Sequence, residues 1–232
     1  MRDRPLPLAR VAVMSSDSAP PPCVDVLILG AGLAGLRAAL SCLRADPGLS
    51  VLVAGLRSGP SGSSFANAND ALGMHAPRTQ QEQDDYRREA RALAGGGFLN
   101  PELVDVQARE AGDRLRDLTD LGFPFQRNPD GTLPGRGSCF SPDSRRAYVF
   151  EGLSKAWACM MEPLSALGCR FAFGVKPVAL VMGERRGAVL ACGEGETLAT
   201  VGARVVVAAL GGPAALFRHA GTGAGVPGYS YG

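Results

Sequence analysis

The sequence predicts an α/β fold, with a Rossmann-like parallel sheet and an antiparallel β-meander. An apolar run at Val24–Leu29 precedes a glycine-rich turn and an amphipathic segment at Leu33–Ala45, as in a buried strand followed by a helix. A second apolar run at Val51–Ala54 completes a strand–helix–strand unit of about 30 residues. After Arg170, short apolar runs alternate with glycine-containing turns, which is typical of a meander.

The composition is that of a globular protein and not of a nucleic-acid binder. The 232 residues include 24 Lys and Arg against 22 Asp and Glu, so the net charge is only +2 and offers no basic excess to nucleic acid. Hydrophobic residues make up 46% of the chain, which is enough for a buried core. We expect one domain over residues 23–232, preceded by a disordered tail over residues 1–22.

Neither a targeting segment nor a metal site is expected. The tail holds only a short, interrupted apolar stretch, and no run of about 18 apolar residues predicts a membrane-spanning helix. Met14 offers a shorter start of the chain. The six cysteines show no C-x-x-C spacing, and two histidines are too few for a three-histidine site. Scattered cysteines without a secretory leader indicate reduced thiols and therefore a cytoplasmic location.

Three further helices are expected in the middle of the chain. Gln80–Ala94 is polar and ends at a run of glycines, and the next helix begins with Asn100 as N-cap and Pro101 at its first position. Gly152–Leu167 has the pattern of the third. Gly55–Pro77 is rich in Ser, Gly and Asn without a helix or strand period, so we expect a long functional loop there.

Four strands are expected after the last helix. They are Val178–Met182, Ala188–Cys192, Thr197–Val201 and Arg204–Leu210. The first three are separated by short glycine-containing turns and predict the antiparallel meander. The fourth is a separate buried strand that ends at two glycines.

The glycines of the first turn have the spacing of a dinucleotide-binding motif. In this motif Gly30 permits the tight turn, Gly32 permits close approach to a diphosphate, and Gly35 permits close packing of helix and strand. The diphosphate would lie at the helix N-terminus, where free N–H groups favour an anion. The alternative is a glycine-rich turn in an ordinary α/β protein.

The second strand lacks the acidic residue that normally holds the ribose hydroxyls. It continues into Gly55, Leu56 and Arg57. The arginine leaves two alternatives open: an NADP site, or a ribose held from elsewhere in the protein. An NAD(P)-dependent dehydrogenase is therefore a further hypothesis, against which the missing acid counts.

Several further stretches accompany the glycine motif. They are Ser61–Ala66, Gly97–Val104, Leu121–Phe125, Asp130–Gly131, Ser144–Arg146, Val205–Gly212 and Thr222–Gly223. Together with the opening VDVLILGAGLAGLRAAL, they resemble the FAD-binding domain of the succinate dehydrogenase/fumarate reductase flavoprotein and L-aspartate oxidase family. The resemblance covers residues 24–232 and implies a Rossmann-like FAD-binding domain.

The resemblance also implies a function and a set of cofactor-binding residues. The function is an FAD-dependent oxidoreductase that exchanges a hydride between FAD and a small (di)carboxylate or amino acid. Ser63 stands where covalently flavinylated members carry histidine, so non-covalent FAD is expected. The implied cofactor-binding residues are Gly30, Ala31, Gly32, Leu33, Ala34, Gly35, Arg57, Ser63, Ser64, Val178, Leu210, Gly211 and Gly212.

Substrate contacts are weaker expectations. Arg145 and Arg146 are candidates for a substrate carboxylate or a flavin phosphate, because arginine forks bind such anions; the alternative is a solvated loop. His75 is most simply a surface histidine. No catalytic acid or base can be named. The expected partners are a small carboxylate substrate or an electron-transfer protein.

The sequence also departs from the family pattern. Asn67–Asp70 replaces a glycine-containing stretch beside the flavin, Leu210 replaces a threonine, and Ser144 replaces a histidine. The family's catalytic arginine and histidines lie beyond the position of Gly232. The alternative function is therefore a non-catalytic or fragmentary flavin- or nucleotide-binding module that needs a partner chain.

Overall fold

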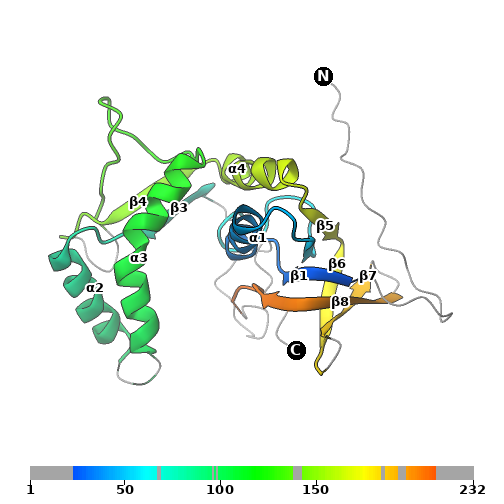
Figure 1. Ribbon diagram of the computed structural model, residues 1–232. Coiled ribbons are helices and arrows are strands. Elements are labelled where there is room, and N and C mark those ends of the chain that lie inside the picture. Colours follow the sequence, from blue (N-terminus) through cyan, green and yellow to red (C-terminus); the bar gives the residue numbers. More distant parts are fainter. Residues whose placement is uncertain are drawn as a thin grey trace. The chain divides into compact units, whose positions relative to one another are not determined.

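The computed structural model describes residues 23–66, 69–95, 97, 99–137, 143–183, 186–192 and 197–212 (Figure 1). The chain divides into two compact units. Unit 1 comprises Met1–Ala68 and Met160–Gly232, and unit 2 comprises Asn69–Cys159. Each unit is described by itself.

Unit 1 is built on a six-stranded sheet with the strand order β5-β2-β1-β8-β7-β6. Its strands are β1 (Cys23–Leu29), β2 (Val51–Gly55), β5 (Arg170–Phe173), β6 (Val175–Val181), β7 (Gly187–Cys192) and β8 (Thr197–Ala208). Strand β1 pairs in parallel with β2 and β8, and β2 pairs in parallel with β5. Strand β7 pairs antiparallel with both β6 and β8. The predicted α/β fold, with a parallel sheet and a meander, is confirmed.

Strand β8 corrects one expectation. Two strands, Thr197–Val201 and Arg204–Leu210, were expected from the sequence, but one strand of 12 residues runs through Gly202. Gly202 pairs with Gly187 of β7 on one side and with Cys23 of β1 on the other. The strand does not break there because its first half belongs to the meander and its second half to the parallel sheet.

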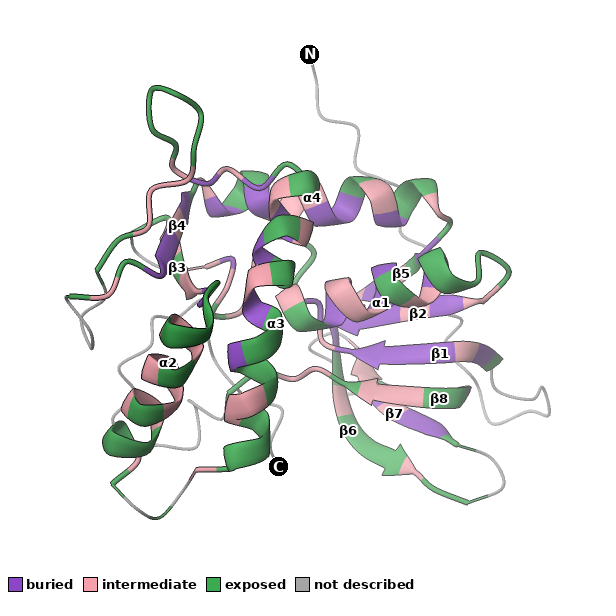
Figure 2. Cartoon of the chain, turned by 60° about the vertical axis from the view of Figure 1, so that its left-hand side comes forward, coloured by how far each residue is buried: buried purple, intermediate pink, exposed green. Residues whose placement is uncertain are grey.

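Both faces of the parallel sheet are covered. Helix α1 (Leu33–Ala45) buries Gly35, Leu36, Ala39, Leu40 and Leu43 at helical spacing. The opposite cluster contains Val24, Leu27, Leu29, Ala54, Ala172, Val175, Ala188, Leu190, Val201 and Ala203, which come from the parallel strands and the meander. Figure 2 accordingly shows most of β1 as buried. The continuous apolar run of β1 is explained by burial on both sides.

Unit 2 combines two long helices with a two-stranded sheet. Helices α2 (Gln80–Leu93) and α3 (Pro101–Asp120) are joined by an ion pair in which Arg87 Nη2 lies 2.7 Å from Asp105 Oδ1. Strand β3 (Ala71–His75) pairs antiparallel with β4 (Ala147–Glu151). Helix α4 (Leu153–Ala166) begins in unit 2, and its residues from Met160 onward are assigned to unit 1.

Strand β3 corrects a second expectation. The stretch Gly55–Pro77 was expected to be a loop without regular structure, but Ala71–His75 forms a strand. This strand has only five residues with a glycine at its centre, so its sequence carries no clear strand signal. Its pairing with β4 creates the element, and β4 supplies Phe150 to the aromatic core of unit 2. The rings of Phe123 and Phe125 each lie 5.4 Å from that of Phe150.

The N-termini of α2 and α3 are both closed by side chains. Thr79 Oγ1 accepts from the Glu82 N–H at 3.2 Å, and the Glu82 carboxylate accepts from the Thr79 N–H at 3.1 Å. Asn100 Oδ1 accepts from the N–H groups of Glu102 and Leu103 at 2.9 and 3.3 Å, which confirms its predicted role as N-cap.

Within the described residues, no helix is long and apolar enough to cross a membrane. In the same part of the chain, no three Asp, Glu, His or Cys side chains gather into a group that could hold a metal ion.

Candidate dinucleotide-binding site

The glycine-rich turn lies where the carboxyl ends of three parallel strands meet. The Gly30 N–H donates to Ala54 O of β2 at 2.8 Å, and the Ala209 N–H, directly after β8, donates to Leu29 O at 2.8 Å. The turn is thus held between the ends of β2 and β8. Strand β1 lies between its parallel neighbours β2 and β8, so the turn is at the carboxyl edge of the parallel strands, where open α/β sheets bind their ligands.

Gly30 and Gly35 are required by close packing. Gly30 has a φ of +115°, and a Cβ built there would lie 2.2 Å from Ala209 O. A Cβ at Gly35 would lie 1.9 Å from Gly30 O and 3.3 Å from Ile28 Cγ2. No side chain fits at either position. The predicted roles of these two glycines, in the tight turn and in helix–strand packing, are confirmed.

Gly32 differs from the other two glycines, because no atom of the described residues lies within 4 Å of a Cβ built there. Gly32 is the N-cap of α1, with a φ of −77°, and no side chain caps the helix. The first turn also contains no acidic residue. Among the described residues, no side chain caps the N–H groups at the positive end of the helix dipole, which is the chemistry of a diphosphate site. Leu33 is partly exposed and Ala34 is exposed in this first turn.

The end of β2 shows how the turn packs where the acidic residue is missing. A Cβ at Gly55 would lie 2.9 Å from the Cβ of the buried Ala31 and 3.5 Å from Phe173 Cδ1. The strand end and the turn are therefore closer together than a larger side chain at Gly55 would permit. Arg57 follows and is exposed.

The Ser-rich loop lies against the turn. A Cβ at Gly62 would lie 4.0 Å from Gly32 Cα, and Gly62 has a φ of +76°. The N–H groups of Phe65 and Ala66 donate to Gly62 O at 3.3 and 3.0 Å, which folds the loop into a helical turn. Ser63 is exposed and Ser64 partly exposed, whereas Phe65 is buried and anchors the loop. Asn67 and Ala68 lie outside the described residues.

The residues after β8 complete the edge. Leu210 packs partly buried against the core of unit 1, and Gly211 and Gly212 are exposed, with a φ of +79° at Gly211. Val178 is not brought to this edge by strand pairing. It lies on β6, beyond β8 and β7, in a bulge between Pro177 and Ala179 where it has no partner in β7.

Arg145 and Arg146 lie in unit 2 and have different surroundings. Arg145 is exposed, in agreement with a solvated position. Arg146 is only 1% exposed, so the solvated alternative is wrong for it. Its Nη2 forms an ion pair with the Glu89 carboxylate of α2, and its guanidinium carbon lies 5.6 Å from the centre of the Tyr86 ring.

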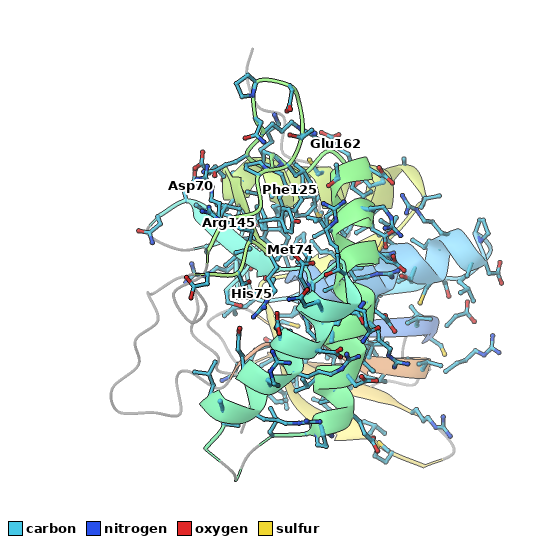
Figure 3. All side chains as sticks on the ribbon, turned by 90° about the vertical axis from the view of Figure 1, so that its left-hand side faces the viewer. Asp70, Met74, His75, Phe125, Arg145 and Glu162 are labelled. Carbon is cyan, nitrogen blue, oxygen red and sulfur yellow. The ribbon has the colours of Figure 1, made fainter. Side chains whose placement is uncertain are left out.

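His75 belongs to the same part of unit 2. The side chain of His75 is partly exposed, but its Nδ1 is buried, and its ring lies 6.2 Å from that of Tyr86. Burial lowers the pKa of His75, the positive charge of Arg146 lowers it further, and Glu89 opposes the shift. Figure 3 labels His75, Met74 and Arg145 on this unit. The pairing of β3 with β4 brings these residues together, and no local sequence signal marks it.

The residues at the carboxyl edge of unit 1 fit the diphosphate of a dinucleotide. The open space at Gly32, the uncapped N-terminus of α1 and the adjacent Ser-rich loop form a cradle with few side chains. Polar contacts in such a cradle come from backbone N–H groups and serine hydroxyls, which suit phosphate oxygens.

The comparison with protein families agrees with this cradle. The family model described as "FAD binding domain" matches residues 25–227. The 8-methylmenaquinol:fumarate reductase flavoprotein subunit of Wolinella succinogenes is 29% identical over 202 residues, which are 84% of this chain and 32% of that protein. The L-aspartate oxidase of Caulobacter vibrioides is 38% identical over 104 residues, which are 45% of this chain and 20% of that protein.

Solved structures show the same fold. A quinol-fumarate reductase with menaquinol molecules superposes with a TM-score of 0.72 at 20% identity, over 90% of this chain and 37% of that one. The 3-ketosteroid-Δ4-(5α)-dehydrogenase of Rhodococcus jostii superposes with a TM-score of 0.67 at 20% identity, over 97% of this chain and 54% of that one. The chain spans between a fifth and a third of the two curated relatives named above.

Proposed function

Because the chain belongs to the FAD binding domain family, with FAD as its cofactor, we propose that it is the flavin-holding part of an oxidoreductase of the fumarate reductase, succinate dehydrogenase and L-aspartate oxidase type. Bound FAD supplies hydride-transfer chemistry, and the protein binds and orients it. The observation that carries the proposal is the uncapped N-terminus of α1 beside the open space at Gly32.

Each part of the cradle has a proposed task. The N–H groups of the first turn of α1 bind the diphosphate, and Gly32 keeps the approach free of side chains. Ser63 and Ser64 donate hydroxyl hydrogen bonds from the loop that packs against Gly32. Gly211 and Gly212 line the edge after β8, where the backbone can approach the cofactor closely. Val178 and Arg57 stay proposed contacts to the remainder of FAD.

We propose that FAD is held without a covalent bond. Ser63 occupies the exposed position in the loop where a histidine would be needed for covalent attachment. A serine hydroxyl is a much weaker nucleophile than an imidazole at neutral pH, and the loop offers it no histidine base among the described residues 56–66.

The proposed substrate is a small dicarboxylate, carboxylate or amino acid, with Arg145 and Arg146 as candidate contacts. The proposal follows the relatives, whose names give fumarate reductase and L-aspartate oxidase. A cytoplasmic location stays a proposal, which the free thiols of Cys23, Cys42 and Cys169 support.

A second candidate is a flavin-binding module that is completed by a partner chain. Two observations favour it. The end of β2 carries Gly55 in place of the ribose-binding acid, so the described residues of this strand end offer no carboxylate to the ribose. The fumarate reductase relatives of Methanothermobacter marburgensis and Wolinella succinogenes are named as subunits.

An absorption spectrum of the purified chain, taken before and after acid precipitation, tests these proposals. We expect a flavin spectrum whose colour moves to the supernatant on precipitation, as non-covalent binding requires. Colour retained in the pellet would show a covalent bond and overturn the role given to Ser63. A protein that stays colourless with excess FAD would reject unaided binding and support the partner-dependent module.

A further inference from the structure

Arg146 is a buried cation with unused hydrogen-bond donors. Its side chain is 1% exposed, and Nη2 donates to the Glu89 carboxylate. Nε and Nη1 are also buried, yet neither has a hydrogen-bond partner among the described residues. The Tyr86 ring, 5.6 Å away, contacts the cation without accepting these N–H groups in the guanidinium plane. Buried donors of a charged group are rarely left unpaired, because each one loses its hydration without compensation.

Two neighbouring side chains also carry buried polar atoms that lack a described hydrogen-bond partner. Ser144 Oγ and His75 Nδ1 are buried, and in the part of the chain that the structure describes neither has a hydrogen-bond partner. Ser144 precedes Arg146 by two residues, and the Ala76 N–H donates to Arg146 O at 2.9 Å, which places His75 beside them. Four unpaired polar atoms from three adjacent residues thus gather in unit 2. Ser144 and His75 are themselves only partly buried, so the group borders the surface.

The unpaired donors of the group point to an anionic ligand. Arg146 and Glu89 neutralise each other, and Tyr86 stays uncharged because burial raises its pKa. The free groups are two guanidinium nitrogens with three N–H donors, one hydroxyl and one imidazole nitrogen, which together suit a ligand rich in acceptor atoms. Burial and the charge of Arg146 lower the pKa of His75, and below that pKa the imidazole gains a positive charge that would balance an added anion.

We propose that Arg146, Ser144 and His75 bind the carboxylate of a small ligand. The carboxylate accepts from the guanidinium and from the Ser144 hydroxyl, and protonated His75 supplies the compensating charge. The choice of a carboxylate over another small anion rests on the proposed function. The two proposals are tested separately, because this site is probed without flavin.

Histidine NMR of the full chain, without FAD, tests the site directly. The chain contains only two histidines, so the variant His75→Gln identifies the His75 signal. The pH titration is run with succinate and, at equal ionic strength, with chloride. Because the bound carboxylate stabilises the charged imidazole, succinate should raise the pKa of His75 relative to chloride, and it should bind more tightly as the pH falls. An identical titration in both salts would mean that ordered water alone fills the group, and would overturn the proposal.

Two variants separate binding from folding. Ser144→Ala removes an unpaired buried hydroxyl, so stability should not fall, whereas succinate affinity should fall about ten-fold with the loss of one charge-assisted hydrogen bond. Arg146→Lys keeps the charge opposite Glu89 but loses the planar donors, and should weaken succinate binding further. Arg88→Gln, on the exposed face of α2 with its side chain 68% exposed, is the matched control and should bind normally.

Unchanged succinate affinity in both Ser144→Ala and Arg146→Lys would overturn the assignment of the site. A chain that binds FAD but shows no succinate response would reject this inference alone. A chain that responds to succinate without binding FAD would reject unaided flavin binding and leave the carboxylate site standing.

Discussion

The N-terminal N–H groups of α2 and α3 are capped by side chains, whereas those of α1 are not. Every helix begins with N–H groups that have no partner within the helix. In α2 and α3 the side chains of Thr79 and Asn100 accept from these groups. In α1 the corresponding residue is Gly32, which has no side chain, and the space in front of it is open.

The capped helix ends stabilise the fold, and the uncapped end of α1 is the one that we propose binds a ligand. Caps on α2 and α3 satisfy the backbone permanently and stabilise unit 2. The end of α1 remains unsatisfied by side chains because FAD phosphate oxygens are proposed to take that place. Four substitutions test this contrast between the helix ends and the side-chain contacts of unit 1, and Gly30→Ala should have the largest effect.

The largest effect is expected from Gly30→Ala. The new Cβ would lie 2.2 Å from Ala209 O, and the φ of +115° is unfavourable for alanine. We expect a loss of about 3 kcal/mol or more in the free energy of unfolding, because strain and overlap add at one position. Urea unfolding followed by circular dichroism measures it. Gly32→Ala, at a position with negative φ and no described atom close by, should lose only about 1 kcal/mol or less, because alanine is a poorer N-cap than glycine. An equal loss in both variants would contradict the two roles.

Gly32→Asp should separate binding from stability. Aspartate is a good N-cap, so the free energy of unfolding should stay equal or rise by a few tenths of a kcal/mol. The same carboxylate would face the FAD diphosphate, and we expect FAD affinity to fall by about 100-fold through like-charge repulsion. Fluorescence titration with FAD measures this. Gly97→Asp introduces the same charge at another open glycine, and a similar loss of affinity there would show that total charge is responsible.

Asn100→Ala should lower stability without changing FAD affinity, which is the reverse of the result expected for Gly32→Asp. It removes the acceptor for the N–H groups of Glu102 and Leu103, and we expect the free energy of unfolding to fall by about 1 kcal/mol. FAD affinity should not change, because this cap belongs to unit 2. The same urea and fluorescence measurements apply, and a parallel loss of FAD affinity would contradict the division of tasks between the helix ends.

The smallest effect on stability is expected from Asp25→Asn, which removes a carboxylate that side chains hold in unit 1. Asp25 accepts from the Ser50 hydroxyl at 2.7 Å and from Arg204 at 3.0 Å, and hydrogen bonds from Ser50 are the main reason why the pKa of Asp25 falls from 3.8 to about 2. The folded pKa lies below the unfolded one, so the stabilisation is complete above about pH 4 and is lost as the pH falls toward 2. Urea unfolding between pH 5 and 2 should therefore be less pH-dependent in Asp25→Asn than in the unmodified chain.

Features fixed by neighbouring residues were predictable from the sequence. The unit of β1, α1 and β2, the glycine turn and the cap at Asn100 depend on short-range patterns, and all of them are present. In the candidate site, the turn, the Ser-rich loop and the residues after β8 come together as the motif implied.

Features fixed by distant pairing were not predictable. Strand β3 exists because β4 pairs with it across two intervening helices, and the same pairing buries Arg146 beside His75. Gly202 suggested a break because glycine is unfavourable within strands, yet pairing on both sides carries β8 through it.

The double membership of β8 has a consequence for synthesis of the protein. Strand β1 begins at Cys23, whereas β8, whose end lies against the glycine turn, ends only at Ala208. A growing chain therefore exposes the turn, with one side missing, until β8 has left the ribosome. Contacts of such long sequence separation form late in folding. Loading of the cofactor must then follow completion of β8, and a chain stalled before that strand would offer the diphosphate only half of its cradle.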